Sequence, residues 1–163
     1  MSGSAGHVEL REPRNEDFET VFALTQNPVA NEMAKVLPRS REDFKTQWAQ
    51  MLHGEGTVTR LIECDAQIVG CINSFPFDRE TQVGYLIAQA YWGKGIGTRA
   101  LLAFLDVENT RPLFAHVAKT NTGSRRMLER CGFTKIDEHD SPETERYMAC
   151  VACDWSVSTT ACE

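Results

Sequence analysis

The sequence has 163 residues, 42% of them hydrophobic and 25% charged, which predicts one globular domain spanning residues 1–163. No apolar run approaches the roughly 18–20 residues that cross a bilayer, and the first residues carry no secretion or import pattern, so we expect no membrane and a cytoplasmic location. Seventeen basic and 23 acidic residues give a net charge of −6, which disfavours binding to nucleic acid and favours a cationic partner such as an amine. We expect the protein to be a monomer or a homodimer.

The N-terminal third predicts a strand followed by two helices. VELREP opens the chain as a short strand, and Asn15 is expected to cap a helix because Phe18, Val21 and Phe22 follow at i, i+3, i+4 spacing. A second helix is predicted from Ser40 to the glycines of residues 53–56. Its apolar face consists of Phe44, Trp48, Met51 and Leu52.

Three β-rich runs come next. TVTRLIEC and QIVGCINSF are joined by the tight link Asp65-Ala66, and TQVGYLIA follows after a short polar stretch. Runs of this kind with short links predict an antiparallel meander.

The C-terminal half changes period. A helix is predicted from Thr98 and is closed before Arg111-Pro112, after which LFAHVA is a strand. Asn121 or Thr122 is expected to cap a short helix that Gly132 ends, and the last strand is about ERYMACVACDW. The order β-α-α-β-β-β-α-β-α-β predicts a mixed α/β domain with helices on both faces of one sheet.

Six cysteines invite a disulfide or zinc interpretation, and Cys150 and Cys153 have the spacing of a ligand pair. Zinc sites of this type need a second pair or histidines at ligand spacing, whereas these two lie in an alternating apolar stretch that predicts a strand. We therefore expect reduced thiols and no metal.

The turn Y91-W92-G93-K94-G95-I96-G97-T98 carries the most specific chemistry, because it lies between a predicted strand and a predicted helix. Glycines allow a sharp turn and a close approach of backbone N–H groups to a ligand, and the start of the helix favours negative charge at the same place. The GxxxxGK[ST] spacing of a P-loop is absent. A dinucleotide-binding fold is also excluded, because it needs GxGxxG after the first strand of a parallel unit, whereas this turn follows a meander. The turn predicts a pyrophosphate cradle, with a purely structural glycine loop as the alternative.

The segment VGYLIAQAYWGKGIGTRALLAF, followed by NTGSRRMLERCGF, resembles the GNAT N-acetyltransferase superfamily. Its signature is Q/R-x-x-G-x-G/A after a strand and NxxSxxxLxxxGF later. Trp92 stands where the signature has Gln or Arg, and the wording YWGKG is similar to the ribosomal-protein-alanine acetyltransferase (RimJ/RimL) type; aminoglycoside 6′-acetyltransferases have similar wording.

The resemblance implies a GNAT fold, with a central mixed, mostly antiparallel sheet, and acetyl-CoA as cosubstrate. It implies that the fourth strand splays from the fifth and that its free backbone groups pair there with the pantetheine arm, at Leu86, Ile87 and Ala88. It implies that the glycine turn binds the pyrophosphate, through Trp92, Gly93, Lys94, Gly95, Ile96, Gly97 and Thr98. It also implies that Asn121 and Ser124 of the later motif stand near the thiol.

Two positions depart from the superfamily. Gln82 stands where many members carry a glutamate, and Leu128 where many carry a tyrosine, and neither side chain exchanges protons. Glu80 as base and Ser124 as thiolate donor are the substitute catalytic candidates, with a solvated loop carboxylate and a helix-capping hydroxyl as the alternatives. His116 is a further candidate base, although a lone histidine in a strand is more often structural.

Two functions remain open on the sequence alone. The first is direct transfer of the acetyl group of acetyl-CoA to a primary amine, either a protein N-terminus or a small molecule. The second is an acetyl-CoA-binding sensor or regulatory domain without turnover. The acceptor site is expected around the first two helices, Asn27 to Leu52, and the loops before the fourth and last strands, and no residue pattern identifies the amine.

Overall fold

A computed structural model describes residues 6–144 and 146–158. Its core is a seven-stranded mixed sheet in the order β1-β2-β3-β4-β5-β7-β6, in which every neighbouring pair is antiparallel except β4 and β5. The strands are β1 Val8–Arg11, β2 Val58–Cys64, β3 Gln67–Phe77, β4 Glu80–Ile87, β5 Leu113–Ala118, β6 Thr134–Ser141 and β7 Cys150–Val157.

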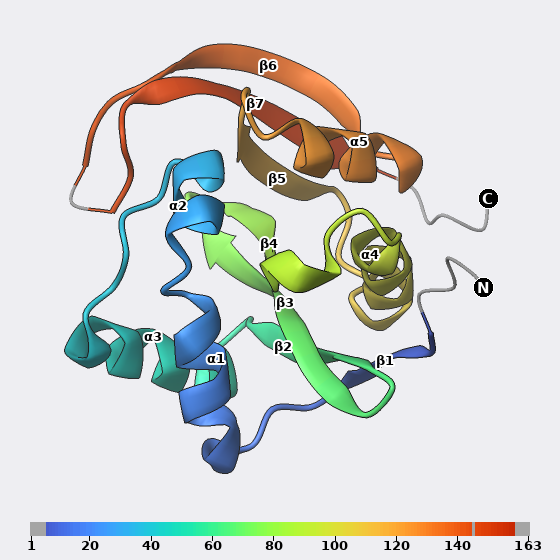
Figure 1. The fold of residues 1–163 in the computed structure, drawn as a ribbon. Coiled ribbons are helices and arrows are strands. Elements are labelled where there is room, and N and C mark those ends of the chain that lie inside the picture. Colours follow the sequence, from blue (N-terminus) through green and yellow to red (C-terminus); the bar gives the residue numbers. More distant parts are fainter. Residues whose placement is uncertain (1–5, 145, 159–163) are drawn as a thin grey trace.

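Helices cover both faces of this sheet, as the sequence predicts (Figure 1). Helices α1 (Phe18–Leu24), α2 (Pro28–Ala34) and α3 (Arg41–His53) lie on one face, and α4 (Ile96–Val107) and α5 (Thr122–Arg130) lie on the other. Each face has its own apolar cluster. One is centred on Phe104, Leu128 and Trp155, and the other on Val21, Phe44 and Trp48. None of the helices in the described part of the chain is long and apolar enough to cross a membrane.

The N-terminal elements confirm one predicted helix and correct another. Ser40 caps α3 by accepting a hydrogen bond from the Asp43 amide at 3.1 Å, as predicted. The predicted cap at Asn15 is wrong, because Asn15 is the first residue of a 3-10 turn, η1 (Asn15–Asp17), whose end continues into α1. The Asp17 carboxylate closes this turn, accepting from the Arg14 amide at 2.7 Å.

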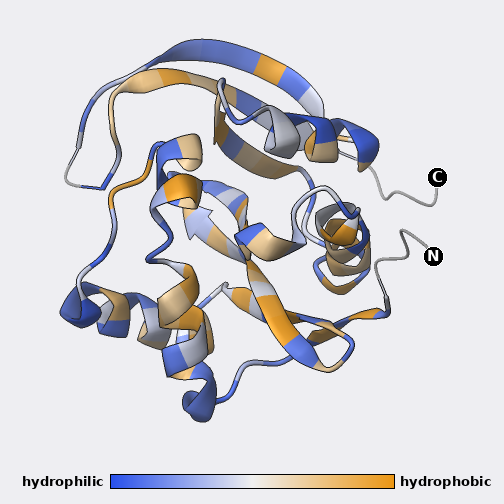
Figure 2. Cartoon of the chain, in the orientation of Figure 1, coloured by the Kyte–Doolittle hydropathy of each residue, from blue (hydrophilic) through white to orange (hydrophobic). Residues whose placement is uncertain are grey.

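Two elements were not predicted. Helix α2 carries a clear signal, because Asn27 accepts hydrogen bonds from the amides of Val29 and Ala30 and proline stands in the first turn. Strand β6 carries almost none: TKIDEHDS is polar apart from Ile136, and the strand lies exposed at the sheet edge (Figure 2). Charged residues at an edge strand discourage pairing with other chains, so hydrophobic alternation is absent there.

The predicted meander is confirmed. Strands β2 to β4 form two antiparallel hairpins with the links Asp65-Ala66 and Asp78-Arg79, and all four link residues have positive φ. In the second half, α4 begins at Ile96, two residues before the predicted Thr98, because Gly95 ends the loop in a left-handed conformation. Asn121 caps α5, accepting from the Ser124 amide at 3.3 Å.

The sheet divides between its fourth and fifth strands. In the described chain β4 and β5 pair at one position, Gln82 with Phe114, and they diverge toward their C-terminal ends. The splay expected between these strands is therefore present, and it opens beside the start of α4.

Candidate active site

The glycine turn has the backbone shape of an anion cradle. Gly93 and Gly95 both have φ of +77°, a region that residues with a side chain rarely adopt, and no atom lies within 4 Å of the place where a Cβ would stand on either one. Gly95 is the N-cap of α4, so the amides that follow it precede the first turn's hydrogen bonds. Residues 93–95 form an exposed loop, and the positive end of the 12-residue helix α4 begins directly after it.

Gly97 serves packing instead. A Cβ at this position would stand 2.5 Å from the sulfur of Met127 in α5. The glycine lets the first turn of α4 approach α5 closely. Of the turn's glycines, Gly93 and Gly95 thus shape the loop, and Gly97 sets the distance between two helices.

Trp92 holds the turn against the fourth strand. Its indole N–H donates to the Ile87 carbonyl at 2.8 Å, and its ring is partly buried. The ammonium group of Lys94 lies 5.7 Å from the centroid of the Tyr91 ring and remains exposed. The turn therefore presents an exposed cation beside its amides, and the indole of Trp92 holds the turn in place.

The hydrogen-bond pattern of β4 decides which backbone groups face the splay. The Ala88 amide donates to the Val69 carbonyl at 2.7 Å, so Ala88 faces β3, and in an antiparallel pair alternate residues face the same way. By this alternation Leu86 also faces β3, whereas Tyr85 and Ile87 face the gap. Leu86 and Ala88 therefore do not offer the free backbone groups that were expected of them. The backbone groups that face the gap are those of Tyr85 and Ile87.

Tyr85 also brings a hydroxyl that was not singled out in the sequence. Its side chain packs against the α4/α5 cluster, and its hydroxyl hydrogen-bonds to Ser124 Oγ. Ser124 is 9% exposed and lies in the first turn of α5, one turn after Asn121. Burial raises the pKa of the Tyr85 phenol, so it stays protonated at neutral pH. The signal available in the sequence was strand alternation, which puts Tyr85 on the same face as Val83 and Ile87.

The other acid–base candidates lie apart from this pair. Glu80 is exposed at the start of β4 beside the hairpin turn, and its carboxylate accepts from the Gln82 side-chain amide at 3.1 Å. Glu80 and Tyr85 are five positions apart in the strand, about 16 Å, and their side chains point to opposite faces of the sheet. Leu128 is fully buried and has no group that exchanges protons. Ser124 and Glu80 are not brought together.

The cysteines are placed for packing. Cys150 and Cys153 lie in β7 three residues apart, so they point to opposite faces and cannot form the ligand pair that their spacing suggests. Cys131 is buried on the core side of α5, where burial raises the pKa of its thiol to about 11, and burial raises that of Cys71 to about 12. Thiols of this kind are poor nucleophiles. Cys162 lies outside the described residues.

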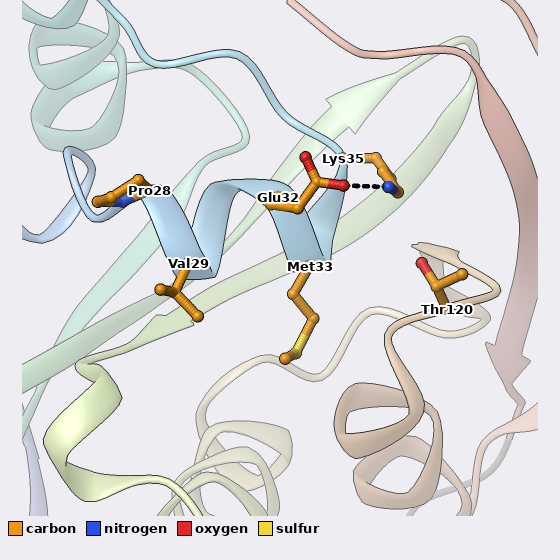
Figure 3. A pocket seen from close by; sticks show the side chains of 6 residues that line it. All are labelled: Pro28, Val29, Glu32, Met33, Lys35 and Thr120. Carbon is orange, nitrogen blue, oxygen red and sulfur yellow. Dashed lines mark hydrogen bonds and ion pairs between the residues drawn. The ribbon is translucent and has the colours of Figure 1, made fainter.

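A groove of about 470 Å³ opens between α2 and the turn that precedes α5 (Figure 3). Its walls are mostly apolar, with Val29 and Met33 pointing from α2 into it and Thr120 on the opposite side. Asn27, which caps α2, donates to Gln89 just after β4 at 3.1 Å, so the groove lies at the open end of the splay. It belongs to the N-terminal region in which the acceptor site was expected.

His116 lies on β5, on the wall of the splay opposite β4. Its side chain is 42% exposed, and its Nδ1 lies 2.6 Å from a carboxylate oxygen of Asp154 on β7. The ring is therefore only partly covered, and within the described residues no hydrogen bond occupies its second ring nitrogen.

Comparisons with known proteins agree with this architecture. The model of one family, described as an acetyltransferase (GNAT) domain, matches residues 7–134. Among curated proteins none matches the sequence.

Solved structures match over nearly the whole chain. A spermidine N-acetyltransferase from Vibrio cholerae in complex with CoA and spermine shares 18% identity at a TM-score of 0.79, covering 96% of this chain and 98% of its own. A phosphinothricin acetyltransferase from Sinorhizobium meliloti in complex with AcCoA shares 14% at 0.78, covering 93% and 88%. A ribosomal-protein-alanine N-acetyltransferase from Brucella melitensis shares 16% at 0.76, covering 93% and 99%. At these identities the likeness concerns the fold.

Proposed function

The chain belongs to the GNAT acetyltransferase family, and from that membership we propose that it transfers the acetyl group of acetyl-CoA directly to a primary amine. The observation that carries this function is the geometry of the splay. An anion cradle lies at one end of an unpaired strand edge, and a pair of hydroxyls lies along the same edge. A cofactor with a pyrophosphate and an extended thiol arm fits this order of groups.

The cofactor would bind as a missing strand. The pyrophosphate would accept hydrogen bonds from the amides of residues 93–98, with Lys94 as an exposed counter-charge and Trp92 holding the turn. The pantetheine arm would pair with the gap-facing groups of Tyr85 and with the Ile87 amide, since Trp92 occupies the Ile87 carbonyl. Asn121 and Ser124 would then stand beside the thiol.

Ser124 supports departure of the thiolate. As the C–S bond breaks, negative charge grows on sulfur, and a hydroxyl that donates there stabilises the transition state more than the ground state. Tyr85 hydrogen-bonds to that hydroxyl and is kept protonated by burial, so it orients Ser124. The thiolate leaves stabilised by the Ser124 hydrogen bond and takes its proton from solvent to become free CoA. The cysteines need not take part.

The acceptor is a protein N-terminal amine or a small-molecule amine. The structural neighbours named above act on a polyamine, on phosphinothricin and on a ribosomal-protein alanine, so the fold accommodates all these classes. An α-amine has a pKa near 8 against about 10.4 for lysine, so it needs less help to lose its proton. The net charge of −6 favours cationic acceptors at long range.

We further propose that residues 1–163 act as a single domain in the cytoplasm, as a monomer or homodimer. Cys71, Cys131, Cys150 and Cys153 form no disulfide among the described residues, and reduced thiols are the norm in a reducing compartment.

The test is a thiol-release assay with purified protein, acetyl-CoA and three amines: an alanine-initiated peptide, spermidine and phosphinothricin. We expect CoA release that depends on one of these amines, with the acetylated amine found by mass spectrometry. Acetyl-CoA binding in a calorimeter without turnover on any amine would indicate a sensor domain, and the proposed activity would then be wrong.

A further inference from the structure

We expect an amine to reach the thioester from the face of the splay on which α2 lies, which we call the open face because side chains there are partly exposed. On the opposite face α4 and α5 close the sheet, with Leu101 and Leu128 fully buried beneath them. On the open face, β5, β7 and β6 instead carry the partly exposed polar side chains His116, Asp154 and His139. An acceptor therefore approaches over these three side chains.

His116 lies next to the deep end of the splay. Gln82 and Phe114 mark the point where β4 and β5 join, and their side chains share a face because the pair is in parallel register. His116 follows Phe114 by two residues, about 7 Å along the strand, so its side chain points to that same face. The Lys119 amide donates to Val151 on β7, and by alternation the backbone of His116 faces the gap.

A carboxylate orients this imidazole. Asp154 Oδ1 lies 2.6 Å from His116 Nδ1, and Asp154 Oδ2 lies 3.0 Å from His139 Nε2. The two rings are 5.6 Å apart between centroids, so both share one carboxylate. Within the described residues no hydrogen bond occupies His116 Nε2. A ring nitrogen held by a carboxylate on one side and open on the other has the arrangement of a general base.

We propose that His116 is the general base that accepts the proton of the acceptor amine, with Asp154 as the positioning residue. The proposal rests on the acetyl transfer proposed above and supplies the base that Gln82 cannot be. The amine nitrogen attacks the thioester carbon, the C–N bond forms and the C–S bond breaks. His116 Nε2 takes the proton that the amine loses, Ser124 donates a hydrogen bond to the departing thiolate, and the proton passes from His116 through solvent to the sulfur to give free CoA. Asp154 stabilises the imidazolium formed in between.

The charged groups around His116 come from three elements. Asp154 faces it from β7, and His139 faces it from β6, with Asp137 acting on His139 from the same strand. The backbone contact to Asp140, opposed by some desolvation and aided by Asp154, raises the pKa of His139. The facing positions on β4, Gln82 and Gly84, carry no charge. On α2, Glu32 and Lys35 are paired with each other.

The experiment compares His116→Gln and Asp154→Asn with the parent protein, using whichever amine of the three-compound panel turns over fastest. His7→Gln is the matched control, because His7 is also exposed and bonded to a carboxylate, that of Glu9 at 2.7 Å, at the far edge of the sheet. We expect His116→Gln to lower kcat by about 10²-fold, Asp154→Asn by about tenfold, and His7→Gln not at all. The acetyl-CoA Kd should stay within twofold in each variant.

The pH profile separates a base from a structural histidine. We expect the deficit of His116→Gln to be largest where an imidazole is neutral and the amine is still protonated, and to shrink as pH approaches the pKa of the amine. If the parent protein turns over and His116→Gln has the same kcat, this inference is wrong and the proposed function stands. If the parent protein turns over none of the amines, both the proposed function and this inference are wrong. Loss of parent activity with EDTA, restored by Zn²⁺, would assign the cluster to a cation and overturn the base.

Discussion

The two sides of the splay differ in the groups that they present: β4 presents backbone groups, and β5 with its neighbours presents side chains. The β4 wall and the turn after it work through backbone, with amides aimed by glycine, by strand alternation and by a helix start. The β5 wall works through side chains drawn from β5, β7 and β6, with His116, Asp154 and His139 meeting across the strands. A backbone site needs particular residues next to each other in the chain, whereas a side-chain site needs only that the strands pair in one register. The first leaves a motif, and the second leaves none.

The largest test of this contrast is Gly95→Val. Loss of two amide hydrogen bonds to a charged phosphate, at about 1.5–3 kcal/mol each, weakens acetyl-CoA binding by about 10²-fold or more. Gly56→Val is the control, because Gly56 has a similar φ of +75° in a loop remote from the splay and its Cβ would meet only Pro76 at ordinary distance. Calorimetry should show loss of binding for Gly95→Val alone. Equal binding by both variants would mean that the cradle lies elsewhere.

Gly97→Val is a poor version of the same test. The added side chain collides with Met127 between α4 and α5, so lost binding could reflect lost packing.

The next test concerns the hydroxyl pair on the β4 side. Ser124→Ala should lower kcat by about 10²-fold or less, with the Kd of acetyl-CoA changed by less than about threefold, because the hydroxyl acts where charge grows in the transition state. Tyr85→Phe should lower kcat by a smaller factor, and the double variant should be no slower than Ser124→Ala, because the phenol acts through Ser124. Multiplying single effects would instead show that the two hydroxyls act independently.

The smallest effect is expected from Glu80→Gln. The carboxylate is exposed beside a hairpin turn and lies about 16 Å along β4 from Tyr85, so we expect turnover within about twofold of the parent at every pH. A rate loss that grows at low pH would make Glu80 the base, and would transfer to the β4 wall the role we assign to His116.

The same contrast explains what could be predicted from the sequence. The meander, α3, the glycine turn and the Asn121 cap were predictable because each depends on residues close together in the chain. Strand β6 was missed because an edge strand exposed on both faces has no apolar alternation. Tyr85 was overlooked beside Ser124 because their contact joins residues 39 apart, and the carboxylate partner of His116 lies 38 residues away.

The single pairing between β4 and β5 has a consequence for handling the protein. A sheet that opens in its middle has two unpaired strand edges of its own, and unpaired edges are where strands of other molecules add on. The cofactor's arm would fill that opening, and a ligand bound only by the folded state adds RT ln(1 + [L]/Kd) to its stability. Bound acetyl-CoA should therefore reduce self-association, and the protein without acetyl-CoA should be the form that precipitates on storage.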